Sequence, residues 1–253
     1  EILEATMSFR SRWYEYLCYR PLLNRYFAED PNFRHEAAPK PRLTERTWKK
    51  NFHLEWATLS RAEKNERTEA GAWIVTEEEP CFVAADVARF GRDLFVQKSM
   101  QTNVAGIRWL KQHFPAHRIH TVTYRAHLPW HIDTTLVPLG PGLVMTNPAR
   151  PTLTSQETAL LEKNDWEIIV GPTPSRTHPL PLSYCSVWLS LNILMIDPKT
   201  ICVEAGETAL QELLDRRGFE VIPVPFWEVS PFGGGLHCAT ADVYREGACE
   251  DYF

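Results

Sequence analysis

The stretch Trp130-His131-Ile132-Asp133-Thr134-Thr135-Leu136-Val137 leads into the turn Gly140-Pro141-Gly142 and then into a second apolar run, Leu143-Val144-Met145. Two apolar runs joined by a glycine-containing turn are typical of a β-hairpin. Thr154 and Glu157 have the spacing of a capping box, which predicts the start of a helix. The run Glu167-Ile168-Ile169-Val170 predicts one more strand. The stretch therefore predicts a unit made of a hairpin, a helix and a strand.

The same order of elements is predicted on both sides of this unit. The unit before it has strands over 81–86 and 93–97, a helix over about 103–114 and a strand over 119–124. The unit after it has strands over 185–195 and 201–203, a helix over about 207–217 and a strand over 220–223. A fourth unit begins at Leu236-His237-Cys238, where 239–243 is expected to be a short strand. The four starts give a period of about 50 residues, which indicates a repeat architecture.

The repeat decides the expected fold class. A unit of this size cannot bury its own apolar face, and stacking neighbouring units around a centre solves that problem. We therefore expect an α/β protein, an α/β propeller of repeated ββαβ modules over 81–253. A doubly wound α/β sheet is the alternative, but its parallel strands need long crossovers in place of hairpins.

Residues 1–80 lack the repeat, and we expect them to be irregular or helical. The segment 1–5 has the pattern of a strand end whose partner lies outside the chain. A charged stretch over 57–70 predicts a helix on the surface. We expect the whole chain, 1–253, to form a single domain.

The composition argues against several classes of protein. The net charge is −5 with both signs interspersed, so no basic surface for nucleic acid is expected. No apolar run approaches the about 18 residues of a membrane span, and the acidic start lacks the apolar core of a signal peptide. The six cysteines are scattered without a CxxC pair, which argues against a zinc site and a disulfide framework. We expect free thiols in a reducing cytoplasm, and no metal or cofactor.

Residues capable of chemistry gather at the starts of the four units. Equivalent positions of a pseudo-symmetric ring converge on its axis, so these side chains are expected to form one site: Asp86, His131, Asp133, Cys185, Ser186, His237 and Cys238. Cys238 follows the three glycines 233–235 and is a candidate nucleophile. A small buried cysteine without chemistry is the alternative for this residue considered by itself.

The spacing of His131 and Asp133 predicts that their side chains lie on one side of a strand. Alternate residues of a strand face the same side, so both side chains are expected to point into one cavity. A carboxylate there can clamp a planar guanidinium group through two hydrogen bonds. The histidine can act as acid and base near neutral pH.

Several longer motifs resemble one family over essentially the whole chain. They are His131-Ile132-Asp133, the run from Gly140 to Arg150, Cys185-Ser186-Val187-Trp188 and Gly233-Gly234-Gly235-Leu236-His237-Cys238-Ala239-Thr240, with Glu79-Pro80-Cys81-Phe82, Gly91-Arg92-Asp93 and Ala38-Pro39-Lys40-Pro41. The chain is similar to the arginine:glycine and inosamine-phosphate amidinotransferases of the guanidino-group-modifying superfamily. The resemblance implies an L-arginine donor, an amine acceptor, and a possible homodimer.

The resemblance also implies roles for single residues. Cys238 matches the nucleophile and His131 the general acid and base. Asp133 matches the carboxylate that clamps the substrate, Arg150 the arginine that pairs with a substrate carboxylate, and Ser186 a serine that contacts substrate. The implied chemistry moves the amidino group of arginine onto the cysteine, releases ornithine, and then passes the group to an amine in ping-pong order.

The sequence departs from the family at two points. The family's third catalytic residue, an aspartate that supports the histidine, falls at Val83, and Asp86 is the nearest carboxylate that could replace it. Family members also carry about one more module before residue 1, so we expect the N-terminal module to be missing. An unpaired sheet edge would follow from that absence.

The acceptor amine is left open among glycine, lysine, an inosamine and a natural-product amine. Cys185-Ser186 stands where the glycine-type enzymes have two serines, and the bulky Trp130 is expected to shape the acceptor pocket. Together with His237 these residues complete the expected substrate site, and they favour a secondary-metabolite acceptor. Two alternatives stay open: a guanidino hydrolase that uses water in place of the amine, and a truncated or degenerate homologue without activity.

Overall fold

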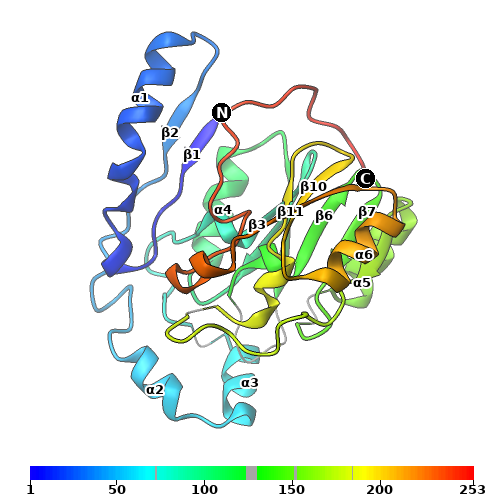
Figure 1. Ribbon diagram of the computed structural model, residues 1–253. Helices are drawn as coiled ribbons and strands as arrows, with labels where there is room; N and C mark the ends of the chain where they lie inside the picture. The colour runs from blue at the N-terminus through cyan, green and yellow to red at the C-terminus, as the bar shows by residue number, and fades with distance from the viewer. Residues whose placement is uncertain (72, 124–129, 151–152, 184) are drawn as a thin grey trace. The chain divides into compact units, whose positions relative to one another are not determined.

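The structure is a computed structural model that describes residues 1–71, 73–123, 130–150, 153–183 and 185–253 (Figure 1). Tyr124, the last residue of one expected strand, lies outside the described residues. The chain divides into two compact units, one formed by 1–87 and 96–130 and the other by 88–95 and 131–253. The expectation of a single domain stays a prediction.

Three modules of the predicted kind follow one another, and each builds one three-stranded sheet (Figure 1). The first holds β3 (Val87–Phe90), β4 (Asp93–Lys98), α4 (Val104–His113) and β5 (Arg118–Thr123). The second holds β6 (Leu136–Gly140), β7 (Leu143–Thr146), α5 (Ser155–Lys163) and β8 (Glu167–Val170). The third holds β9 (Leu194–Met195), β10 (Thr200–Glu204), α6 (Thr208–Arg216) and β11 (Glu220–Val224).

The strand pairing confirms a hairpin followed by a crossover helix. β7 pairs antiparallel with β6 and parallel with β8, and β10 pairs antiparallel with β9 and parallel with β11. The predicted capping box is present at the start of α5, where Thr154 Oγ1 accepts from the backbone N–H of Glu157. Gly218 follows α6 at a φ of +85°, a left-handed conformation that glycine adopts without strain. The helices therefore begin and end where the sequence indicates.

The segments before the hairpins differ from the prediction. Each is a 3₁₀ turn and not a strand: η3 (Ala84–Asp86), η4 (Ile132–Thr134) and η5 (Val187–Leu191). In the second module the backbone N–H of Thr135 bonds to the carbonyl of Ile132 at 2.8 Å, which closes the turn and delays β6 until Leu136. The prediction that His131 and Asp133 lie on one strand, with their side chains on the same side, is therefore wrong.

The expected strand over 239–243 is also absent. The backbone N–H of Ala239 bonds to Gly235 O and that of Thr240 bonds to His237 O, so the chain turns there. Asp242 forms ion pairs with Arg89 and Arg245, which hold this segment through side chains instead of a strand ladder.

The second and third modules share a buried apolar cluster. Leu210 and Leu214, one turn apart on α6, face the strands and are fully buried. They pack in one cluster with strand residues, among them Val137, Leu139, Met145, Ile201 and Val203. Burial of apolar area of this kind is the main favourable term that holds sheet and helix together.

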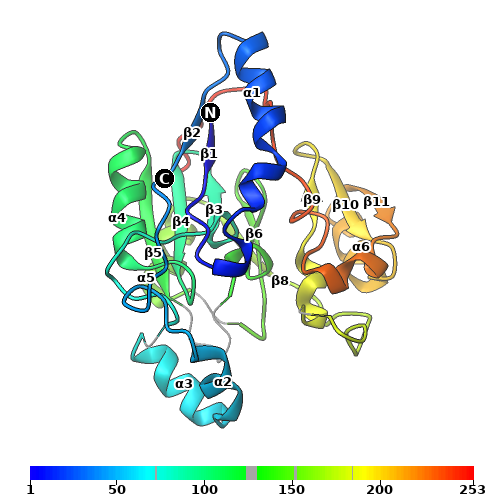
Figure 2. The ribbon, with the colours of Figure 1, turned by 90° about the vertical axis from the view of Figure 1, so that its left-hand side faces the viewer.

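Residues 1–80 contain a small sheet besides helices. β1 (Ile2–Glu4) pairs in parallel with β2 (His35–Ala37), and α1 (Arg20–Glu29) connects them and lies alongside (Figures 1 and 2). The expectation that the first strand has no partner in the chain is therefore wrong. Further along lie the short turns η1 (Arg10–Arg12) and η2 (Glu15–Cys18) and the helices α2 (Phe52–Thr58) and α3 (Arg61–Glu69).

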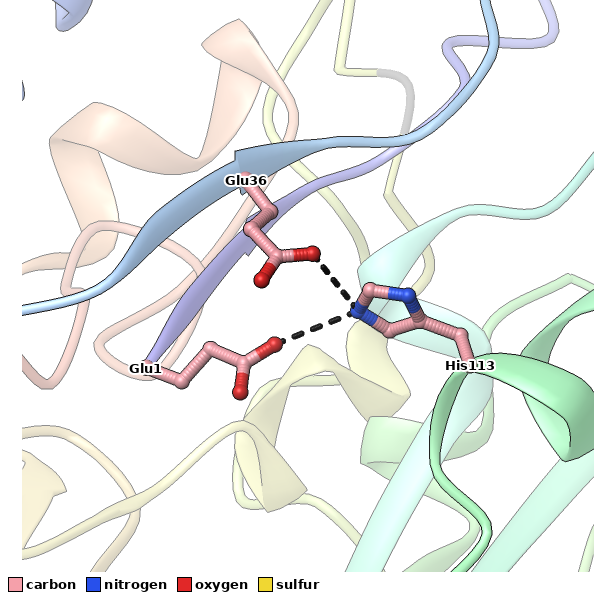
Figure 3. A group of neighbouring side chains, drawn as sticks. All are labelled: Glu1, Glu36 and His113. Atoms are coloured by element: carbon pink, nitrogen blue, oxygen red, sulfur yellow. Dashed lines mark hydrogen bonds and ion pairs between the residues drawn. The ribbon is translucent and has the colours of Figure 1, made fainter.

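A histidine ties this small sheet to α4. His113 Nε2 lies 3.2 Å from Glu1 Oε1 and 3.6 Å from Glu36 Oε2 (Figure 3). The ring of His113 also stacks on Trp109, with 4.7 Å between the ring centroids. The Nε2 atom of His113, in the last turn of α4, therefore faces two carboxylates of the small sheet. Within the described residues, these three side chains form the one group with the spacing of metal ligands.

No helix in the described part of the chain is both long and apolar enough to cross a membrane.

Candidate active site

Asp133 and Cys238 lie in contact in the unit formed by 88–95 and 131–253. Cys238 Sγ donates a hydrogen bond to Asp133 Oδ2 at 3.3 Å, although the two residues are 105 positions apart. The Asp133 side chain is only 5% exposed, and His237 Nδ1 lies 3.7 Å from the same oxygen. The repeat therefore does bring the predicted cysteine and clamp carboxylate together.

Asn192, at the end of η5, joins the two residues. Its Nδ2 donates to Asp133 Oδ2 at 2.9 Å, and its Oδ1 accepts from the backbone N–H of Cys238 at 3.0 Å. Its backbone carbonyl accepts from the N–H of His237 at 3.4 Å. Asn192 is 3% exposed, so these bonds are made away from water. One side chain therefore holds both the backbone of the cysteine and the carboxylate.

The glycines before Cys238 serve close packing. A Cβ on Gly234 would lie 2.6 Å from Cys238 Cβ, and a Cβ on Gly235 would lie 2.8 Å from Asn192 Oδ1. Gly233 has nothing within 4 Å of the position of a Cβ, but its φ is +97°, a conformation that other residues rarely adopt. The glycines therefore let the loop approach Asn192 and turn back on itself.

Two pKa shifts follow from this arrangement. Although Cys238 is exposed as a whole residue, partial desolvation of its thiol and the charge of Asp133 raise the pKa of Cys238 to about 12. Burial by itself would raise the pKa of Asp133, but the hydrogen bond to His237 and the charges of His131 and His237 outweigh it and lower that pKa. At neutral pH the site therefore holds a thiol beside a carboxylate.

The other predicted residues of this unit lie around the pair. His131, which has a strained φ of 52°, is close enough to lower the pKa of Asp133 by its charge. Arg150 Nη1 donates to Thr134 Oγ1 at 3.3 Å, next to Asp133 in the chain. Burial and the charge of Asp133 raise the pKa of Cys185, whose neighbour Ser186 is exposed at the start of η5.

Asp86 and Trp130 belong to the other unit. Asp86 is fully buried, and its Oδ2 accepts from Ser99 Oγ and from Thr102 Oγ1, both at 2.6 Å. Trp130 Nε1 donates to Met100 Sδ at 2.9 Å and packs against an aromatic cluster. These contacts hold local structure, and the catalytic role of Asp86 and the pocket role of Trp130 stay predictions.

The sequence reasoning missed Asn192. The available signal was a polar amide inside the apolar run Leu191-Asn192-Ile193-Leu194-Met195. A buried amide needs partners for its donors and its acceptor, so an asparagine in such a run predicts a specific polar contact.

The comparisons with known proteins place the chain in a family. No family model matches it. Over 254 residues the chain is 37% identical to the mitochondrial glycine amidinotransferase of Danio rerio, covering 100% of this chain and 58% of that protein. It is 34% identical to the L-arginine:L-lysine amidinotransferase of Pseudomonas savastanoi pv. phaseolicola, covering 100% of this chain and 65% of that protein. The chain thus spans somewhat over half the length of the curated relatives it matches.

Solved structures agree. SxtG, an amidinotransferase from Microseira wollei in the saxitoxin biosynthetic pathway, superposes with a TM-score of 0.84 at 36% identity, over 99% of this chain and 68% of that one. The inosamine-phosphate amidinotransferase of Streptomyces griseus gives a TM-score of 0.80 at 35% identity, over 99% of this chain and 66% of that one. The fold is therefore of the α/β-propeller class, as the repeat predicted. The chain belongs to the amidinotransferase family.

Proposed function

We propose that the protein transfers the amidino group of L-arginine to an amine through a covalent intermediate on Cys238. The observation that carries the proposal is the pairing of the Cys238 thiol with the buried Asp133 carboxylate at 3.3 Å. A guanidinium cation held by Asp133 has its central carbon beside the sulfur. Arg150, held next to this site by Thr134, is suited to pair with the carboxylate of the substrate.

The first half-reaction begins when the bound guanidinium neutralises Asp133. This lowers the cost of ionising the thiol, whose proton passes to His131, and the thiolate attacks the guanidinium carbon. His131 returns the proton to the departing nitrogen, the carbon–nitrogen bond breaks, and ornithine leaves. Cys238 then carries the amidino group as a thiouronium cation.

The second half-reaction reverses these steps with a different amine. A neutral acceptor amine attacks the same carbon and gives its proton to His131, the carbon–sulfur bond breaks, and the cysteine regains its proton.

We propose an amine of secondary metabolism as the acceptor, because Cys185-Ser186 matches the inosamine-phosphate type. Glycine, lysine and an inosamine phosphate, offered separately, identify the acceptor by product analysis.

Mass spectrometry of the protein after exposure to arginine tests the donor step without the acceptor. We expect one added amidino group on the peptide that contains Cys238 and release of ornithine. The variant Cys238→Ser should gain no such group, while Cys18→Ser, which removes an exposed free thiol elsewhere, should label like the unchanged protein. Amidino transfer by Cys238→Ser would overturn the covalent scheme. Release of citrulline without an acceptor would identify a guanidino hydrolase instead.

We propose Asp86 as the third catalytic residue, because the family's own aspartate falls at Val83 in this sequence. The variant Asp86→Asn keeps an oxygen for the hydroxyls of Ser99 and Thr102 but loses the charge. We expect formation of the adduct on Cys238 to slow by about 100-fold or more, since the loss of a charged partner of a catalytic histidine has large effects. An unchanged rate in a folded variant would assign Asp86 to structure alone.

A further inference from the structure

We infer that Asn192 is a positioning residue of this site, which sets the nucleophile Cys238 and the clamp carboxylate Asp133 at a fixed separation. The inference rests on the proposed function for the roles of these two residues. It rests on geometry alone for the link between them.

The two ends of one amide group make the link. Asn192 Nδ2 donates to Asp133 Oδ2 and its Oδ1 accepts from the N–H of Cys238, at 2.9 and 3.0 Å. An amide rotated by half a turn would set its NH₂ against the N–H of Cys238 and its oxygen against the carboxylate. The two partners therefore fix the orientation of the amide, and only asparagine offers a donor and an acceptor in this space.

The loop that carries Cys238 is shaped to receive this amide. Gly235 packs so closely that a Cβ there would lie 2.8 Å from both Asn192 Cβ and Oδ1. The Asn192 carbonyl also accepts from the N–H of His237, so two successive backbone N–H groups of the loop bind one residue. Asn192 is itself held at the end of η5, where its own N–H bonds to Leu189 O at 2.9 Å.

The consequence for the reaction is positional. Asp133 Oδ2 accepts from both Asn192 and Cys238, so the amide holds the carboxylate oxygen that faces the sulfur. Loss of the amide frees both the loop and the carboxylate to move. A misplacement of reacting groups of about 1 Å can cost about 100-fold in rate.

Two variants and two readouts test the inference. In Asn192→Ala we expect the rate constant of adduct formation at saturating arginine to fall about 100-fold. The arginine concentration for half-saturation should change much less, since Asp133 keeps its other partners. Asn192→Asp should slow the reaction as well, and in addition shift the alkylation of Cys238 by iodoacetamide to higher pH. A second carboxylate against Asp133 opposes formation of the thiolate, and a thiol pKa that is higher by about one makes alkylation at fixed pH about tenfold slower.

The alkylation profile does not require turnover, and it separates this inference from the proposed function. If the unchanged protein forms no adduct, the proposed function fails, and the difference in alkylation between Asn192→Asp and Asn192→Ala still decides the inference. Asn164→Ala, which removes an amide that donates to Leu160 O on α5, should match the unchanged protein in both readouts. Thermal melting establishes that each variant is folded. If Asn192→Ala does not fold, Asn192→Ser, which keeps a short polar group, is measured in its place. The inference would be overturned if the folded Asn192 variants formed the adduct as fast as the unchanged protein. It would also be overturned if Asn192→Asp and Asn192→Ala showed the same pH dependence of alkylation.

Discussion

The sulfur of Cys238 donates a hydrogen bond to the Asp133 carboxylate at 3.3 Å, so ionisation of the thiol sets two negative charges side by side. The carboxylate stays ionised, because nearby histidines lower its pKa. The thiol stays protonated, because its partial desolvation and that carboxylate raise its pKa to about 12. In the proposed function, the guanidinium cation of the substrate neutralises Asp133 and thereby favours the thiolate.

Replacing Asp133 should release the thiol. In Asp133→Asn the charge that disfavours the thiolate is gone, and we expect the pKa of Cys238 to fall. Alkylation of Cys238 by iodoacetamide at pH 8 should be about tenfold faster, as for a thiol pKa that is lower by about one, while adduct formation with arginine should be lost. Peptide mapping measures both, with Asp197→Asn in an exposed turn as the control. Slower alkylation in Asp133→Asn would contradict the electrostatic account.

The glycines before Cys238 should not tolerate alanine. A Cβ at Gly234 or Gly235 collides with Cys238 or Asn192, so either substitution displaces the loop. We expect a loss of about 1–3 kcal/mol in the free energy of unfolding, as for overpacked sites, with a strong loss of adduct formation. Gly247→Ala is the control. Alanine at its φ of +103° adds backbone strain, but nothing lies within 4 Å of the new Cβ, so adduct formation should be retained. Urea denaturation gives the stabilities, and a fully active Gly235→Ala would show that the contact with Asn192 is dispensable.

Glu4 in β1 should stabilise the protein at neutral pH and not in acid. Its carboxylate binds Lys40 at 2.7 Å and Arg20 at 2.8 Å, and these bonds outweigh burial and lower its pKa. A lowered pKa means that the contribution is present above the unfolded value of about 4.5 and is lost as the pH falls through the folded value. Glu4→Gln should cost about 1–3 kcal/mol at pH 7, and this cost should shrink as the pH falls below about 4.5.

The control for Glu4 is an exposed ion pair on the same unit. Glu15 pairs with Arg12 at 2.8 Å, with both side chains largely in water, so Glu15→Gln should cost less than about 0.5 kcal/mol at either pH. Equal losses in the two variants, measured by urea denaturation, would show that burial does not strengthen the Glu4 contacts.

Glu207 should behave in the opposite way. It is 1% exposed, and burial raises its pKa despite the bond that its Oε2 accepts from the N–H of Ser175. A raised pKa means a destabilising contribution that is full above the folded value and absent below the unfolded one. Glu207→Gln should therefore raise the free energy of unfolding by about 1 kcal/mol at pH 8 and have no such effect at pH 4. Destabilisation at pH 8 would contradict this assignment.

The framework was predictable because it depends on local patterns. Apolar runs around a glycine turn locate the β6–β7 hairpin, and the Thr154–Glu157 pair locates the start of α5. The turns before the hairpins were not predictable in the same way. Ile132 and Thr135 have strand propensity, yet one backbone hydrogen bond between them closes a 3₁₀ turn, and propensity does not report such competition.

The contact between Cys238 and Asp133 was expected from the sequence, whereas the hydrogen bonds of Asn192 to both residues were not. The repeat places Cys238 and Asp133 near the starts of two units, and these starts are expected to converge on one axis. Asn192 lies outside the repeat phase, and its role depends on a fit with Gly235 that only the folded loop creates. Close three-dimensional fit between distant segments leaves no periodic signal in a sequence.

The reactive groups stand in the short turns η4 and η5 and in the loop at 233–238, and the described hydrogen-bonded strands begin after the turns. A substitution in such a turn changes the chemistry of the site without breaking a strand ladder. Under the proposed function, one amine acceptor can therefore be exchanged for another by altering turn residues, without any change in the pairing of the strands.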